Sequence, residues 1–339
     1  SEAQAEELAG KLRELGVLVE SYSQGGATGS CVRHPHLFAG RECHGCAQAM
    51  CSLCGAQDKA WTCEACEIRL RRKHAFFLAR VSVLLGILLA VLLYAWKDSH
   101  ARSVRTDWSR TLQVALVVLK AGNLDESSIP ALRAHIPLLE RRLAQEYDQY
   151  RNKGERPFAF RVFGPQEVTS IPPQNPGDTY VSLARFNYDL WRYFRRVNAS
   201  IGIDPGGYDA VVYVVARPPK NSRTTSVEGV SQRGGWLGVV EVELSPNMAD
   251  YALFVAAHEL FHILGAEDKY DATGQPLVPQ GLGDPALAPL YPQRHAEVMA
   301  RLVAIAPGRG RAPESLDELE VGMQTATEIG WVSNADKTK

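Results

Sequence analysis

Residues 258–268 read His258-Glu259-Leu260-Phe261-His262-Ile263-Leu264-Gly265-Ala266-Glu267-Asp268. The stretch continues a run of good helix formers, so we expect it to lie in a helix. Two imidazoles four residues apart point from the same face of a helix and can share one zinc ion. Glu259, one position after the first imidazole, lies where a carboxylate can hold a metal-bound water. Gly265 can adopt a positive φ, which ends the helix and turns the chain back.

The third protein ligand is expected to be Asp268, because the turn at Gly265 allows this residue to swing back toward the ion. Glu267 and Asp271 are competing candidates. Three protein ligands leave one coordination position open, as in catalytic zinc sites. Zinc lowers the pKa of a bound water toward about 7 and polarises a carbonyl, while Glu259 as general base takes the proton and passes it to the leaving amine. The segment therefore predicts peptide-bond hydrolysis.

The segment HELFHILGAED resembles the metzincin consensus HExxHxxGxx(H/D), in the variant with Asp as third ligand. Residues 295–300 (HAEVMA) are similar to the Met-turn of that family, which would make Met299 a hydrophobic floor beneath the metal; ordinary core packing is the alternative reading. Many members carry a Tyr two residues after that Met, where this chain has Arg301. Any oxyanion stabilisation is then expected from elsewhere, with Tyr270 and Tyr291 as candidates.

The resemblance implies a two-subdomain peptidase domain with a mixed sheet over residues 111–333, of the α+β or α/β class. Alternating strands and helices upstream of the zinc helix fit this class. We expect strands at 111–119, 157–162, 208–216 and 235–244, and helices at 129–150, 180–197 and 315–329. Segment 235–244 is expected to be an edge strand that binds substrate backbone, and the polar segment 217–234 a loop. The aromatic residues of 186–194 are expected to pack in the core.

All seven cysteines lie between Cys31 and Cys66. Together with one histidine they form four pairs, each separated by two residues: Cys31 and His34, Cys43 and Cys46, Cys51 and Cys54, and Cys63 and Cys66. Eight such ligands suffice for two tetrahedral structural zinc ions, whose closed coordination leaves no catalytic position. The spacing resembles the B-box and related cross-brace zinc fingers, which implies that pairs one and three share one ion and pairs two and four the other. Spacing alone also allows two sequential ribbons.

Residues 76–96 (FFLARVSVLLGILLAVLLYAW) are apolar apart from Arg80. At about 1.5 Å per residue they would cross a hydrocarbon core of roughly 30 Å, so we expect a transmembrane helix rather than a buried core helix. Basic residues crowd its N-terminal side, which predicts a cytoplasmic N-terminus, and a cytosolic location suits reduced thiols. The peptidase domain would then face the periplasm or the exterior. Residues 1–24 are expected to form an amphipathic helix and residues 97–110 a stalk.

Lys plus Arg (37) nearly equals Asp plus Glu (38), which argues against nucleic acid as a partner. The prediction is a membrane-anchored zinc endopeptidase with one catalytic and two structural zinc ions. Its substrate would be a peptide or protein on the exported side, and its partners membrane lipid and a cytosolic protein bound by the finger. Two alternatives remain: a catalytically inactive, peptide-binding signalling or scaffold protein, and a zinc amidase acting on cell-wall peptide.

Overall fold

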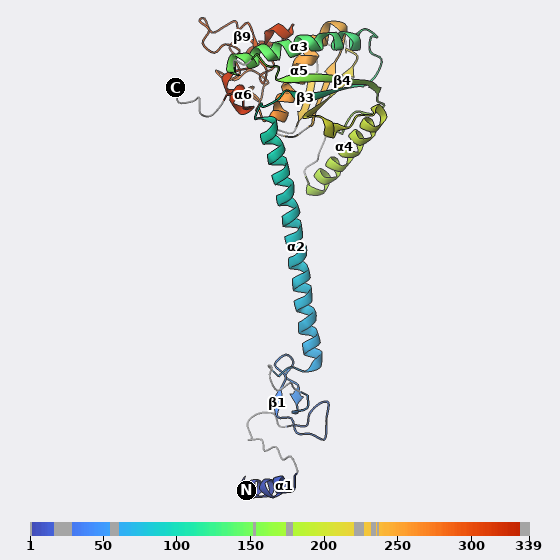
Figure 1. Cartoon of the computed structure of the whole chain (residues 1–339), viewed down its shortest axis with the longest axis vertical. Helices are drawn as coiled ribbons and strands as arrows, with labels where there is room; N and C mark the ends of the chain where they lie inside the picture. Colours follow the sequence, from blue (N-terminus) through green and yellow to red (C-terminus); the bar gives the residue numbers. More distant parts are fainter. Residues whose placement is uncertain are drawn as a thin grey trace. The chain divides into compact units, whose positions relative to one another are not determined.

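A computed structural model describes residues 2–16, 29–54, 61–151, 154–173, 179–219, 227–231, 235 and 237–332. The chain divides into two compact units, Ser1–Ala95 and Trp96–Lys339 (Figure 1). Each unit has its own core and is described by itself.

The first unit contains one short helix, a small two-stranded sheet and most of a long helix. Helix α1 spans Glu2–Glu14, and strands β1 (Arg41–Glu42) and β2 (Ala49–Met50) pair antiparallel. Leu8 of α1 and Leu15, which follows the helix, are exposed, and most of the remainder of the expected helix 1–24 lies outside the described residues. The hydrophobic cluster beside the strands has three buried members, Cys43, Met50 and Cys66, among the described residues. A core this small is typical of modules whose folding depends on a bound metal ion.

Helix α2 (Glu64–Arg105) contains the apolar run. Its stretch Glu64–Lys97 is long and apolar enough to cross a membrane, and no side chain in its most apolar part is buried. Leucines point outward all round the helix, as Leu84 and Leu92 do. By length and composition this helix is therefore a candidate membrane span.

The second unit is built on a five-stranded mixed sheet in the order β4-β3-β5-β7-β6. Its strands are β3 (Leu112–Lys120), β4 (Phe158–Glu167), β5 (Ala210–Arg217), β6 (Val227–Ser231) and β7 (Leu237–Glu243). The first four strands in this order are parallel, and β6 alone is antiparallel to its neighbour. The fold is therefore mixed α/β, compatible with the predicted class.

One strand assignment was wrong. Segment 235–244 was expected at the edge, but β7 lies inside the sheet between β5 and β6, and β6 falls in the segment expected to be a loop. Residues in β7 alternate between partly and fully buried. A strand whose two faces are covered unequally shows this alternation both at the edge and in the interior of a sheet. The pattern of segment 235–244 therefore could not show that β6 pairs with it.

Helices cover both faces of the sheet (Figure 1). Helices α3 (Ser128–Arg151) and α5 (Ala249–Leu264) pack on one face with Val114, Leu116 and Val118 of β3. Helix α4 (Tyr180–Ile201) packs on the other face with Ala115, Val117 and Leu119. Burial on both faces explains why β3 is apolar without alternation.

The C-terminal part of the unit consists of short elements. Strands β8 (Ala296–Glu297) and β11 (Leu319–Glu320) pair parallel, and β9 (Val303–Ala306) and β10 (Arg309–Arg311) pair antiparallel. The expected helix 315–329 was too long, because only α6 (Met323–Glu328) is α-helical and β11 precedes it. Three single 3-10 turns, at Pro205–Gly207, Pro246–Met248 and Leu316–Glu318, connect larger elements.

The expected stalk is in part integrated into this unit. Residues up to Arg105 continue α2, and the Arg105 guanidinium donates to the carbonyls of Asp209 (3.2 Å) and Gly235 (2.8 Å). Trp108 is buried in an aromatic cluster with Trp331, and its indole N–H donates to Ile329 O at 2.8 Å. Phe261 of α5 packs on the same Trp331 ring at 5.7 Å. These contacts join the segment that follows α2, the C-terminal Trp331 and helix α5 in one aromatic cluster.

Candidate metal centres

Helix α5 brings the two histidines to one end of the sheet. Ala249–Leu264 is apolar on nearly all sides and almost completely buried, so packing holds it rigidly. Gly265 ends the helix with φ +114°, a value that L side chains rarely adopt, and its N–H donates to His262 O at 3.0 Å. The chain then reverses and carries Asp268 back toward the helix.

The side chains of His258, His262 and Asp268 converge on one point. Nε2 of His262 lies 3.1 Å from Nε2 of His258, and Asp268 Oδ1 lies 3.0 Å from the former and 3.4 Å from the latter. Ligands about 2.0–2.1 Å from a tetrahedral zinc ion are roughly 3.3 Å apart. The three separations therefore fit a shared zinc ion.

The hydrogen bonds of the two imidazoles determine their tautomers. Nδ1 of His258 lies 3.0 Å from Val298 O, and Nδ1 of His262 lies 2.9 Å from Ala266 O. Carbonyl oxygens only accept, so each neutral ring carries its proton on Nδ1 and directs a lone pair from Nε2 into the cluster. Two ring lone pairs and a carboxylate oxygen facing one another repel unless a cation lies among them. A backbone carbonyl that orients a ligand histidine is the usual support of a metal site.

The electrostatic environment keeps Asp268 ionised, the form in which a carboxylate binds a metal ion. Burial opposes ionisation of Asp268, but the adjacent imidazoles of His258 and His262 hold the pKa of its carboxyl well below the usual range. Burial also lowers the pKa of His262, yet the contacts with Asp268 and Ala266 outweigh it and raise that pKa overall. Asp268 is 41 % exposed, so the cluster is accessible from solvent on that side.

Glu259 lies beside the cluster without belonging to it. Its Oε1 is 3.9 Å from His258 Nε2, and its side chain is almost fully buried. Its Oε2 has no hydrogen-bond partner within the described part of the chain. A buried carboxylate oxygen without a partner is costly, so this atom is available to accept a hydrogen bond from a group that enters the site. Gly238 of β7 allows this approach, because a Cβ there would lie 3.3 Å from Glu259 Cβ.

The two competing third ligands lie away from the cluster. Glu267 has an exposed side chain, and its backbone N–H donates to Glu328 at 2.9 Å. Asp271 Oδ1 accepts from Thr273 N (2.8 Å), Thr273 Oγ1 (2.6 Å) and Gln275 N (3.1 Å), so it closes its own turn. Asp268 is the candidate that meets the histidines.

The segment expected to be a Met-turn runs directly against this centre. Met299 is fully buried, and the carbonyl before it, Val298 O, is the acceptor for His258. Arg301 takes φ +62°, and its guanidinium lies 4.7 Å above the ring of Tyr270. The ring of Tyr270 in turn stacks 6.3 Å from that of His258. Of the two candidate tyrosines, Tyr270 is the one with a contact to the centre.

Two buried ionic groups support the site and were missed by the sequence analysis. Lys269 is 2 % exposed, and its Nζ donates to Glu267 O (2.9 Å) and both carboxylate oxygens of Glu328 (2.9 and 2.8 Å). Glu297 is fully buried and accepts from Met299 N at 2.6 Å and Thr325 Oγ1 at 2.6 Å. These residues connect the ligand loop and the Met299 turn to α6. Nothing in the local sequence identified them, because their partners lie far along the chain.

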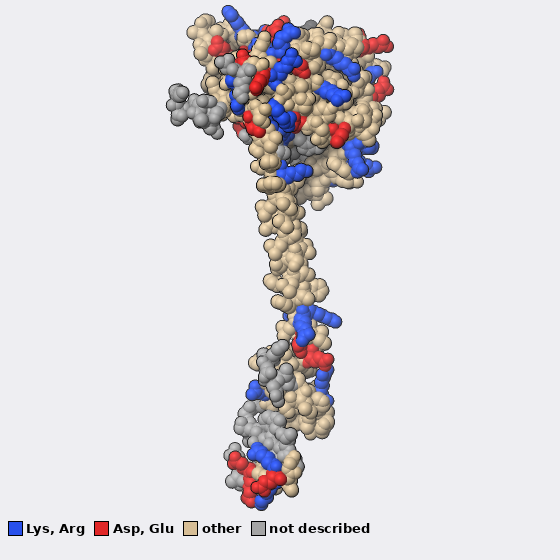
Figure 2. All heavy atoms as spheres, in the orientation of Figure 1, with Lys and Arg blue, Asp and Glu red and all other residues tan. Residues whose placement is uncertain are grey.

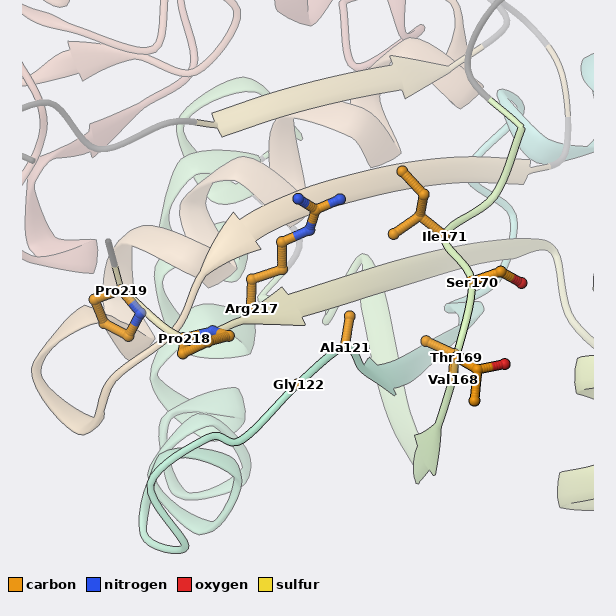
Figure 3. Close-up of a pocket in the computed structure, with 9 residues that line it drawn as sticks. All are labelled: Ala121, Gly122, Val168, Thr169, Ser170, Ile171, Arg217, Pro218 and Pro219. Carbon is orange, nitrogen blue, oxygen red and sulfur yellow. The ribbon is translucent and has the colours of Figure 1, made fainter. Parts of the chain in front are cut away.

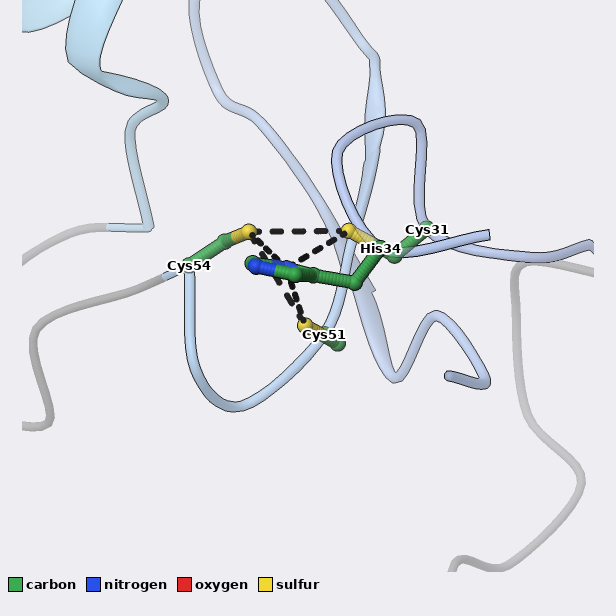
Figure 4. Close-up of side chains that lie close together, drawn as sticks. All are labelled: Cys31, His34, Cys51 and Cys54. Carbon is green, nitrogen blue, oxygen red and sulfur yellow. Dashed lines mark hydrogen bonds between the residues drawn. The ribbon is translucent and has the colours of Figure 1, made fainter. Parts of the chain in front are cut away.

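The first cysteine cluster joins pairs one and three: Cys31, His34, Cys51 and Cys54 (Figure 4). His34 Nδ1 lies 3.4 Å from Cys51 Sγ and 3.2 Å from Cys54 Sγ. Cys54 Sγ lies 3.5 Å from Cys31 Sγ and 3.8 Å from Cys51 Sγ. Sulfur ligands about 2.3 Å from a tetrahedral zinc ion are roughly 3.8 Å apart, so the four atoms can hold one ion.

The second cluster joins pairs two and four: Cys43, Cys46, Cys63 and Cys66. Cys46 Sγ and Cys63 Sγ are 3.7 Å apart, and none of the seven cysteines forms a disulfide. The backbone N–H of Cys63 donates to Cys43 Sγ at 3.2 Å and lowers the pKa of that thiol, which falls to about 6. The thiolate is the form that binds metal. Pairs one and three, and two and four, meet as in a cross-brace finger and not as sequential ribbons.

A separate pocket of about 440 Å³ lies at the carboxyl ends of β3, β4 and β5 (Figure 3). Glu259 contacts Gly238 near the amino end of β7, so the pocket and the His-His-Asp centre lie toward opposite ends of the strands. The charged group in the pocket lining is Arg217, which pairs with Glu241 at 2.7 Å. We assign this pocket no chemistry.

No protein-family model matches the chain, and no curated protein is similar to it in sequence.

Proposed function

We propose that the protein is a membrane-anchored, zinc-dependent endopeptidase of metzincin-like design, with His258, His262 and Asp268 as ligands of the catalytic ion. The observation that carries the proposal is the convergence of two Nε2 lone pairs and a carboxylate oxygen, with both Nδ1 atoms bonded to backbone carbonyls. The glycine turn after the helix and the buried Met299 segment beside His258 further support the family resemblance.

Zinc bound at this centre supplies a Lewis acid that acidifies a water and polarises a peptide carbonyl. Glu259 is the general base, because its carboxylate is buried beside the ligands, with Oε1 3.9 Å from His258 Nε2 and Oε2 without a partner among the described residues. The same oxygen then returns the proton to the leaving amine. A protein that only binds peptides has no use for this carboxylate, so Glu259 favours catalysis over a scaffold role.

The rest of the proposal concerns placement. The apolar part of α2 crosses the membrane, with the two-zinc finger in the cytoplasm and the peptidase domain on the periplasmic or extracellular side. Support comes from the outward apolar side chains of α2 and from the basic residues that precede its apolar run. Closed coordination leaves the finger no catalytic position, which is consistent with a structural role and with a cytosolic protein as its partner.

The test combines metal analysis with turnover of a fluorogenic peptide library by the full-length protein. Three clusters predict three zinc ions per chain, and His262→Ala should remove one. Glu259→Gln should keep all three while turnover falls by about 10²–10⁴-fold. Glu267→Gln is the matched control, a neighbouring carboxylate outside the cluster, and should change neither quantity.

Two outcomes would overturn the proposal: a wild-type chain that binds only two zinc ions, or unchanged turnover in Glu259→Gln. Parallel assays on cell-wall peptide fragments separate the rival activity. Cleavage confined to those fragments would identify an amidase instead of a general endopeptidase.

A further inference from the structure

Helix α4 has an exposed aromatic face that the core does not explain. Tyr193 and Phe194 pack on the sheet as expected, but Tyr188 is 56 % and Trp191 54 % exposed. Their rings lie 5.9 Å apart. Val181 is also exposed. Tyr188 follows Val181 by seven residues and Trp191 follows Tyr188 by three, so the three side chains lie on one side of the helix. The expectation that all these aromatic residues are core residues was therefore wrong.

The N-terminal half of α4 projects beyond the sheet (Figure 1). Even Leu183, which lies on the same stripe as the buried Phe194, is 45 % exposed. Sheet packing begins near Leu190, a partly buried member of the core on this face. The first two turns therefore present apolar side chains that the described part of the unit covers only in part.

Arginines border this face. Arg185, Arg192 and Arg196 follow one another along the adjoining side of the helix, and Arg195 lies over the Trp191 ring at 5.2 Å. Asp189 is the one acidic residue of α4. In the space-filling view a group of basic side chains lies beside part of this helix (Figure 2). Aromatic residues flanked by arginines are typical of a helix that lies in the headgroup region of a membrane, where the guanidinium groups meet phosphates.

The chain keeps this unit close to any membrane that α2 crosses. The apolar run ends at Trp96, and Arg105 is already buried in the second unit by its bonds to Asp209 O and Gly235 O. Nine helical residues span only about 14 Å. A unit tethered this closely has its surface in permanent reach of lipid headgroups, so even a weak contact is populated.

We propose that α4 is an interfacial helix that docks the peptidase unit on an anionic phospholipid surface through Val181, Tyr188, Trp191 and the flanking arginines. The inference rests on the membrane anchoring in the proposed function, but not on catalysis. Docking would fix the orientation of the metal centre relative to the bilayer and so favour substrates at a set height above it.

The test uses full-length protein in vesicles of phosphatidylglycerol mixed with phosphatidylcholine, or of phosphatidylcholine alone, with and without brominated acyl chains. The difference in emission between wild type and Trp191→Phe isolates Trp191. Brominated lipid should quench that emission about twofold in the anionic vesicles and much less in the zwitterionic ones, because arginine–phosphate attraction drives docking.

A charge-reversed variant, Arg185→Glu with Arg192→Glu and Arg196→Glu, should abolish the quenching. The matched control reverses three exposed arginines that lie outside α4, namely Arg141, Arg294 and Arg309, and should keep it. The inference would be overturned if brominated lipid quenched the Trp191 emission in neither kind of vesicle, or to the same extent in anionic and zwitterionic vesicles.

Alkaline carbonate extraction separates the two proposals. If the protein stays in the membrane but Trp191 is not quenched, the docking of α4 is refuted and the anchoring by α2 is not. Protein that is released by carbonate refutes the anchoring by α2 itself, and with it the premise of docking.

Discussion

Replacement of Lys269 by Met tests whether a buried ion pair holds the ligand loop in place. Lys269 directly follows Asp268 and donates three hydrogen bonds, two of them to the carboxylate of Glu328. Removing one partner of a buried pair costs about 3–5 kcal/mol, because the other charge stays buried without compensation. Glu328 keeps 17 % exposure, so we expect a loss of about 3 kcal/mol in the free energy of unfolding.

The same substitution should weaken zinc binding about 10–100-fold, the usual effect of removing a group that supports a ligand. Urea denaturation measures the first quantity and competition with a zinc chelator the second. The double variant Lys269→Met with Glu328→Gln should be more stable than Lys269→Met alone, because it leaves no unpaired charge.

Lys120→Met is the control, since Lys120 pairs at 3.2 Å with the largely exposed Glu167 and should contribute at most about 1 kcal/mol. If Lys269→Met matches this control in stability and keeps wild-type zinc affinity, the reasoning is refuted. The loop would then be held by its backbone bonds alone, such as Lys269 N to Met299 O at 3.0 Å.

Three further predictions follow from burial and coordination. Burial raises the pKa of the Glu146 carboxyl from 4.5 to about 7. Between these two pH values the folded state retains a proton that the unfolded chain releases, so the contribution of Glu146 to stability falls as the pH rises from 4.5 to about 7. The free energy of unfolding of wild type relative to Glu146→Gln should therefore drop by up to about 3 kcal/mol between pH 5 and pH 8, and a pH-independent difference would contradict this. Met299→Ala should lower the free energy of unfolding by about 2–5 kcal/mol and Met299→Leu by less than about 1.5, as urea denaturation can show; equal losses would mean that the side chain is not packed as described. Cys54→Ser should remove one zinc ion by metal analysis and leave peptide turnover by the second unit unchanged, whereas a loss of both finger ions would show that the two clusters fold as one.

The sequence by itself determined the parts of this protein whose partners lie nearby along the chain. Histidines four residues apart share a helix face, a glycine ends that helix, and cysteines two residues apart form a knuckle, because helix and turn geometry fixes these relations over a few residues. The apolar run of α2 is of the same kind. Its length and composition alone predict a helix long enough to cross a membrane.

The tertiary structure decided which distant groups meet. It selected Asp268 over Glu267 and Asp271 for the cluster, paired the cysteine knuckles as a cross-brace, and added β6 outside β7. It also paired Lys269 with Glu328 and left Trp191 exposed on a helix whose pattern suggested burial. A local pattern records that a side chain is apolar or charged, but whether it is buried, and against what, depends on chain segments that only folding brings together.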